Sequence, residues 1–101
     1  MSIKCNIPQV NALRKRVEDK VGYQAQTHTS FISLSYDIEQ LTHNHISEST
    51  LERLWGYSAR RADVVSMHTL NVLSMAVGMQ NWNDFCRHLA EDSEVESDVI
   101  T

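Results

Sequence analysis

The chain has 101 residues, of which 42% are hydrophobic and 22% charged, and its formal net charge is −4. This length and composition favour one globular domain with a single modest core, and they exclude a disordered chain and a two-domain protein. No apolar run approaches the roughly 18 residues of a membrane span, and the opening MSIKCNIPQV lacks the apolar segment of a secretory signal, so we expect a cytoplasmic protein.

The first predicted helix begins at Pro8, because the fixed φ of proline suits the first helical position. Apolar residues follow at three- and four-residue spacing and predict one buried face: Val10, Leu13, Val17 and Val21. Gly22 is a suitable end for this helix. Residues 1–23 carry five bases against two acids, or +3, so this end of the chain is suited to meet phosphates.

A second helix is predicted after a polar linker, with Ser30 as its N-cap. Its apolar stripe consists of Phe31, Leu34, Ile38 and Leu41. The segment THNH at residues 42–45 breaks the stripe. Asn44 is the residue there that best tolerates the left-handed conformation of a tight corner.

The third helix has the clearest start, in the segment ISESTLERLWGY at residues 46–57. With Ser47 as N-cap, Ile46 and Leu51 occupy the two positions of a hydrophobic staple, and the hydroxyl would accept from an amide of the first turn. A capping box of Ser49 and Glu52 is the alternative, two residues later. We expect Leu51, Leu54 and Trp55 to point inward and Gly56 to end the helix.

Residues 57–66 read as a polar link to two more helices. The fourth carries Leu70, Leu73 and Val77 on one face and closes at Gly78; the fifth opens at Asn81 and turns inward Trp82, Phe85, Cys86 and Leu89. Residues 91–101 hold five acids and no base, which predicts a disordered acidic tail after a domain of residues 1–90. With five short helices and no strand, the predicted class is all-α.

Two short helices across a tight corner, the second one staple-capped, form a helix-turn-helix. The pattern of this corner and helix resembles that of lambda-repressor/Cro-like domains in Ile46, Ser47, Thr50, Leu51 and Leu54. The longer string ISESTLERLWGY, with TLNVLSMAVGMQNWNDFC downstream, is similar to small bacterial helix-turn-helix proteins with an S-x-x-TL-x-RLWGY signature. The resemblance covers about residues 30–89 and implies a compact five-helix, lambda-repressor-like fold that regulates transcription.

The turn departs from that family's pattern. If Ile38 is the equivalent of the aliphatic residue in the first helix, the turn is two residues longer than the standard one. The glycine usual in the turn is replaced by His43, Asn44 and His45. The angle between the two helices, and with it the presentation of the third helix, depends on this corner.

On the predicted third helix, the helical period leaves four residues outward as candidates for base readout: Glu48, Ser49, Glu52 and Arg53. An arginine can bind guanine O6 and N7, and a glutamate can accept from cytosine N4. Helix N-termini, hydroxyl groups and basic side chains next to the helix are suited to bind backbone phosphates. The candidate phosphate contacts are therefore Ser30, Ser47, Arg60 and Arg61.

No enzyme, metal or cofactor site is expected. The histidines lack zinc spacing, HNH at residues 43–45 is too short to be informative, and no phosphate loop or nucleophile elbow is present. Cys5 and Cys86 have no paired spacing and suggest reduced thiols, with a bridge between them as the alternative. The resulting hypothesis is a homodimeric regulator that binds duplex DNA. The alternative, favoured by Glu48 and Glu52, is a module that binds a protein partner without DNA.

Overall fold

The computed structural model describes residues 2–4, 7–57 and 64–100 of the chain. Five helices and two short strands follow one another in this part of the chain: β1 (Ser2–Lys4), α1 (Pro8–Val21), α2 (His28–Thr42), α3 (Glu48–Trp55), β2 (Val64–Ser66), α4 (Met67–Ala76) and α5 (Trp82–Ile100). The described chain is therefore mostly helical, in agreement with the expected class.

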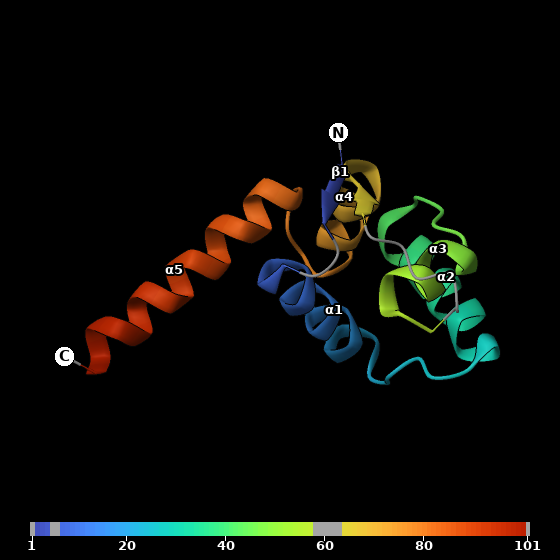
Figure 1. Ribbon diagram of the computed structural model, residues 1–101, viewed down its shortest axis with the longest axis horizontal. Helices are drawn as coiled ribbons and strands as arrows, with labels where there is room; N and C mark the ends of the chain where they lie inside the picture. The colour runs from blue at the N-terminus through green and yellow to red at the C-terminus, as the bar shows by residue number, and fades with distance from the viewer. Residues whose placement is uncertain (1, 5–6, 58–63, 101) are drawn as a thin grey trace.

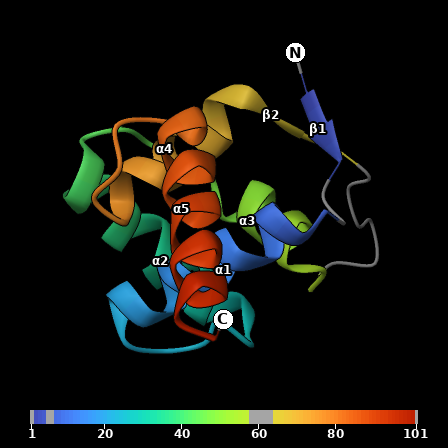
Figure 2. The same cartoon turned by 90° about the vertical axis from the view of Figure 1, so that its left-hand side faces the viewer.

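Helices α1 to α4 form the body of the molecule, and α5 contributes its first turns to it before it extends away (Figure 1). In Figure 2 α5 lies in front of the other helices, and it contacts α4 and α1. The largest side chains of the core come from all five helices: Leu13, Phe31, Leu34, Ile38, Leu51, Leu54, Leu70, Leu73, Trp82 and Phe85. One continuous core thus fixes α3 against its neighbours.

Three of the helices begin with the same arrangement of two hydroxyl residues. A Ser or Thr at the N-cap accepts from the amide three residues later, and the hydroxyls of the two residues lie 2.9–3.0 Å apart. The pairs are Thr27–Ser30 for α2, Ser47–Thr50 for α3 and Ser66–Thr69 for α4. Each cap satisfies an amide that the helix leaves unpaired, and each stabilises its helix by about 1 kcal/mol.

Two of these caps test the predicted helix starts. Ser47 is the N-cap of α3, so its prediction is confirmed and the competing capping box at Ser49 is not used. Ser30 as the N-cap of α2 is wrong. Thr27 is the cap, and Ser30 lies in the first turn, where its amide donates to the Thr27 hydroxyl at 3.1 Å. Two hydroxyl residues three positions apart can each cap, and the helix takes the earlier one.

The predicted helix ends are correct at Gly22 and Gly56, which cap α1 and α3 in left-handed conformations with φ of 87° and 76°. At the end of α4 the C-cap is Val77, and the predicted Gly78 follows it in a left-handed conformation with φ of 89°. The left-handed residue after α2 is His43 (φ 59°) and not Asn44. Leu41 is also wrong as a core residue, since it is 44% exposed. Helix α2 continues regularly to Thr42, whose side chain is buried, and this rotation turns Leu41 outward.

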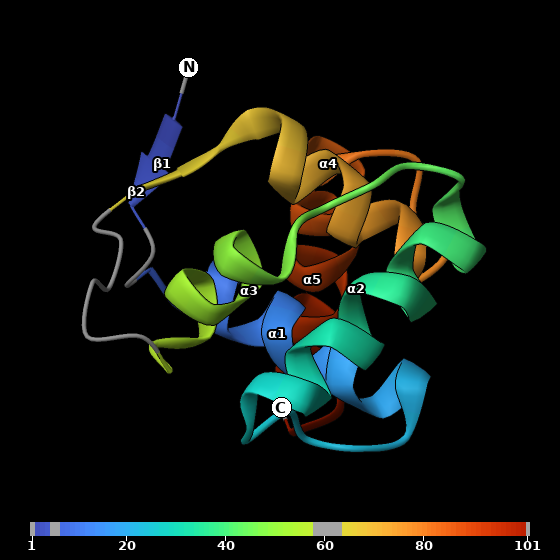
Figure 3. The ribbon, with the colours of Figure 1, turned by 90° about the vertical axis from the view of Figure 1, so that its right-hand side faces the viewer.

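The expectation of no strand is corrected by β1 and β2, which pair antiparallel with Ser2 opposite Ser66, Ile3 opposite Val65 and Lys4 opposite Val64. The strand β2 lies in the predicted polar link, and its central Val65 is buried. Three-residue strands that pair across about 60 residues of chain leave no local alternation long enough to recognise. The two-stranded sheet lies beside α3 and α4 (Figure 3).

At the other end of the chain, Asn81 caps α5, because its side-chain oxygen accepts from the Asp84 amide at 2.8 Å. The predicted opening of this helix is therefore confirmed. Helix α5 runs on through residues 91–100, while the division into a domain of residues 1–90 and an acidic tail stays a prediction.

Candidate nucleic-acid interface

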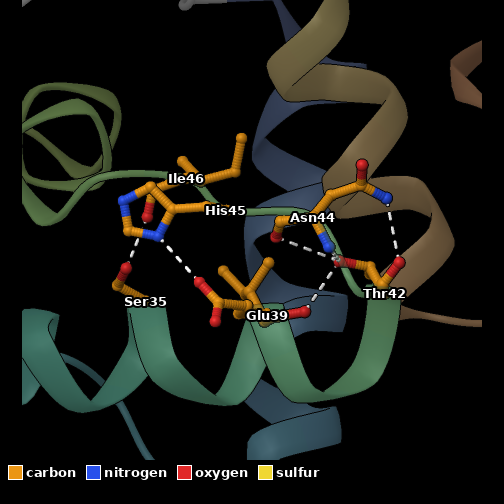
Figure 4. Close-up of polar contacts among 7 residues, drawn as sticks. Ser35, Glu39, Thr42, Asn44, His45 and Ile46 are labelled. Atoms are coloured by element: carbon orange, nitrogen blue, oxygen red, sulfur yellow. Dashed lines mark hydrogen bonds and ion pairs between the residues drawn. The ribbon is translucent and has the colours of Figure 1, made fainter.

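The corner between α2 and α3 is residues 43–47, and its first half is stabilised by the last residue of α2. The Thr42 hydroxyl donates to the Ile38 carbonyl at 2.8 Å and accepts from the Asn44 amide at 3.1 Å. The Asn44 side-chain amide donates to the Thr42 carbonyl at 2.9 Å (Figure 4). Asn44 thus satisfies a helix-end carbonyl through its side chain, and the neighbouring His43 takes the left-handed conformation.

The second half of the corner is attached to the middle of α2. The buried Ser35 hydroxyl donates to the Ile46 carbonyl at 2.5 Å, and the His45 ring nitrogen Nδ1 lies 2.9 Å from the Glu39 carboxylate (Figure 4). Ile46 is 4% exposed and Leu51 fully buried, as the predicted staple requires. The corner between α2 and α3 is therefore anchored at both ends.

The carboxyl end of α3 is held by α1. Arg14 Nη1 donates to the Leu54 carbonyl at 2.6 Å, and the Trp55 indole N–H donates to the Glu18 carboxylate at 3.0 Å. A cation at the last carbonyls of a helix also complements its dipole. Two long side chains of α1 consequently fix the carboxyl end of α3, in addition to the burial of Leu54 in the core.

The amino end of α2 contacts the outer side of α3. His28 Nδ1 lies 2.6 Å from a Glu52 carboxylate oxygen, and the Glu52 side chain is 13% exposed. One of the two carboxylates predicted to read bases is thus engaged within the protein. This contact leaves Glu48 as the candidate readout carboxylate of α3 that forms no such contact with α2.

The other three candidate readout residues differ in exposure. Ser49 and Arg53 are exposed, and Glu48 is half-buried at the start of α3. The side chain of Arg53 makes no hydrogen bond or ion pair with any described residue, so its guanidinium is available to a ligand. Of the four, Ser49 and Arg53 are therefore the best placed to contact a partner.

The four candidate phosphate contacts also differ in their surroundings. The Ser30 and Ser47 hydroxyls are engaged in the capping pairs of α2 and α3. Ser30 and Ser47 are half-buried at neighbouring helix starts, where amides point outward. Arg60 and Arg61 lie outside the described residues. The proposed role of these four residues in phosphate contact stays a prediction.

Three residues that position α3 were not identified from the sequence: Arg14, Glu18 and His28. Their partners lie 24–40 residues away in the chain, and neither spacing nor residue type indicates such pairs. The apolar stripes predicted one buried face for α1 and one for α2. The helical period then places Arg14 and Glu18, four residues apart, on one side of α1.

Further chemistry is limited in the residues that the structure describes. No three His, Cys, Asp or Glu side chains there converge as metal ligands. Burial raises the pKa of the Cys86 thiol, which keeps it protonated at neutral pH. None of the described helices has both the length and the apolar character needed to cross a bilayer. No protein-family model, curated protein or solved structure matches the chain.

Proposed function

We propose that this protein binds duplex DNA in a sequence-specific manner and regulates transcription, with α3 in the major groove of a lambda-repressor-like arrangement. The observation that carries the proposal is the state of Arg53, an exposed and unpartnered cation on a short helix whose opposite face is buried. The helix itself is fixed by its cap, by the corner and by α1. A rigid support of this kind is what base recognition requires.

Within this proposal the residues of α3 have different roles. Arg53 donates to guanine O6 and N7, Ser49 contacts a neighbouring base, and Glu48 accepts from cytosine N4. Glu52 positions the amino end of α2 through His28 and does not read bases. The starts of α2 and α3 face the phosphates with their amides.

The proposal includes a homodimer. One module of this size covers a single half-site and buries too little DNA for strong specificity, so two copies on two half-sites are expected. The net charge of −4 also makes a purely electrostatic, sequence-independent mode weak. Affinity for a selected site should therefore exceed affinity for random duplexes by a wide margin.

Selection from a random duplex library, followed by fluorescence anisotropy over a series of salt concentrations, tests this function. We expect affinity that falls steeply with salt. Arg53→Gln should weaken binding to the selected site by about 1–3 kcal/mol, or roughly 5- to 150-fold, with less effect on random duplexes. Arg87→Gln, at an exposed position on α5 outside the basic segment of residues 1–23, is the matched control for loss of one charge. Absence of binding to pooled duplexes at low salt would contradict the proposal.

A second function is favoured by a specific feature of α2. Ile32 and Tyr36, one helical turn apart, are 48% and 64% exposed. Large apolar side chains at this spacing suit the docking of a partner protein without DNA. Under this function, Tyr36→Ser abolishes binding to that partner and Arg53→Gln does not. Under DNA binding by α3 the effects of the two variants are reversed.

A further inference from the structure

A pocket of about 220 Å³ lies between α3 and β2, beside the residue proposed to read DNA. Helix α3 contributes Thr50, Arg53 and Leu54 to its wall, all three residues of β2 form the opposite side, and Thr69 of α4 completes it. The two sides come from distant parts of the chain, and Figure 3 shows α3 and β2 on the same side of the molecule. The sequence analysis gave no indication of this pocket.

The charge of the lining is positive. Among the described lining residues, Arg53 is the one that carries a charge, and none of these residues has a carboxylate. The exposed Lys4 is the direct strand partner of Val64, so a second cation stands at the edge of the sheet next to the pocket. An unpartnered guanidinium with no neighbouring carboxylate favours an anion.

Hydroxyls provide further donors. Ser66 and Thr69 both line the pocket, and their oxygens lie 3.0 Å apart. The pair has two O–H groups and uses one of them internally, so one O–H remains to donate whichever residue supplies the internal bond. Of the Ser47–Thr50 pair on the other side only Thr50 lines the pocket, so this pair offers an O–H to a ligand when Ser47 supplies the internal bond. These donors suit an oxyanion.

The apolar part of the lining and the volume of the pocket determine which ligand body can bind beside the anionic head. Leu54, Val64 and Val65 supply a hydrophobic surface that can cover a short hydrocarbon body. The pocket is smaller than the roughly 300–1,000 Å³ of sites for drug-sized ligands, so the occupant has to be small. An anionic head with a few carbon atoms matches both limits.

We propose that this pocket binds a small organic oxyanion, a carboxylate or a phosphate monoester, whose head pairs with Arg53 and the hydroxyls while its carbon chain packs on β2. Because Arg53 cannot contact the ligand and a base at once, the ligand competes with DNA. The binding step is independent of the proposed function, and the competition step depends on it.

Amide NMR spectra of the ¹⁵N-labelled full chain, titrated with butyl phosphate, butyrate, inorganic phosphate and neutral butanol, test the binding step. We expect butyl phosphate or butyrate to shift the amides of Thr50, Arg53 and Thr69, and the tighter of the two identifies the head group. Arg53→Gln should weaken this binding by about tenfold or more, since a charged hydrogen bond is lost, while Arg87→Gln should not.

The pocket would be overturned by an absence of shifts with either anion up to about 20 mM, far above a millimolar Kd, or by equal affinity in Arg53→Gln. Equal shifts by butanol would also overturn it, because the anionic head would then be irrelevant.

The competition step needs the DNA assay described above. Addition of the bound anion at saturation should lower DNA affinity, whereas the same concentration of chloride should not reproduce the effect. If the anion binds and the DNA affinity is unchanged, the competition is wrong and the pocket stands. If the anion binds and no duplex binds at all, the proposed DNA function fails separately from the pocket.

Discussion

Replacement of Ser35 by Ala tests whether the corner before α3 is anchored as the structure indicates. The Ser35 hydroxyl donates to the Ile46 carbonyl, and both residues are buried, at 5% and 4% exposure. Water therefore has little access to the carbonyl once the hydroxyl is removed. A buried acceptor left without its donor costs about 1–3 kcal/mol of unfolding free energy.

A matched variant separates this cost from the change in helix propensity. Alanine favours a helix over serine by up to about 0.7 kcal/mol, and this gain partly hides the loss in Ser35→Ala. Ser33→Ala makes the same exchange at an exposed position of the same helix. The difference between the two variants therefore isolates the hydrogen bond, and we expect it to be about 1–3 kcal/mol.

Urea and thermal unfolding followed by circular dichroism measure this difference. For a domain of this size, 1 kcal/mol corresponds to about 4–8 °C in Tm, so Ser35→Ala should melt roughly 5–20 °C below Ser33→Ala. The urea slopes should agree, since both variants bury the same surface. Midpoints that coincide within about 0.5 kcal/mol, the usual scatter of surface substitutions, would refute the anchoring role of Ser35.

Three further predictions concern other parts of the fold. Leu51→Ala removes a fully buried side chain and should cost about 2–5 kcal/mol in urea unfolding, whereas a smaller loss would mean that α3 is loosely packed. Gly22→Ala meets no atom within 4 Å but must keep φ at 87°, so it should cost about 1 kcal/mol from backbone strain alone. The Gln80 amide and then Arg87 lower the pKa of Asp84, so its stabilisation exists above the unfolded pKa and disappears as pH falls through the folded value. The stability difference between wild type and Asp84→Asn should therefore shrink on acidification below about pH 4, and a constant difference would contradict the shift.

Local signals predicted the ends of α3 correctly. The apolar pair Ile46 and Leu51 around the Ser47 cap, and Gly56 at the carboxyl end, are features that act within one or two turns. Their physical cause is contained in the segment itself, so the sequence is sufficient to find them.

The errors occurred where several local solutions are nearly equal in energy. Thr27 and Ser30 are both good N-caps, and His43 and Asn44 both accept a left-handed conformation after α2. The choice at His43 is decided by Thr42, whose buried hydroxyl and carbonyl are already bonded to Asn44. A tertiary burial pattern thus selects between alternatives that the sequence leaves open.

Other features could not be predicted because they depend on long-range pairing. The register of β1 with β2 joins Lys4 to Val64, and the pocket beside Arg53 exists only because that strand faces α3. The partners of Glu52 and Leu54 come from α2 and α1 for the same reason. The fold class was therefore accessible from periodicity, while the surroundings of the candidate site required the structure.

The side chains of α3 can be separated by whether they have a partner within the protein. Glu52 and Trp55 bond to other helices, and their substitution should change stability first and DNA affinity only as a consequence. Ser49 and Arg53 are exposed, so their substitution should change affinity without changing stability. A protein that used this helix only as a structural element would show no such separation, since every substitution would then act through unfolding. Parallel measurement of unfolding and binding across these four positions therefore decides whether α3 is a recognition element or a part of the core.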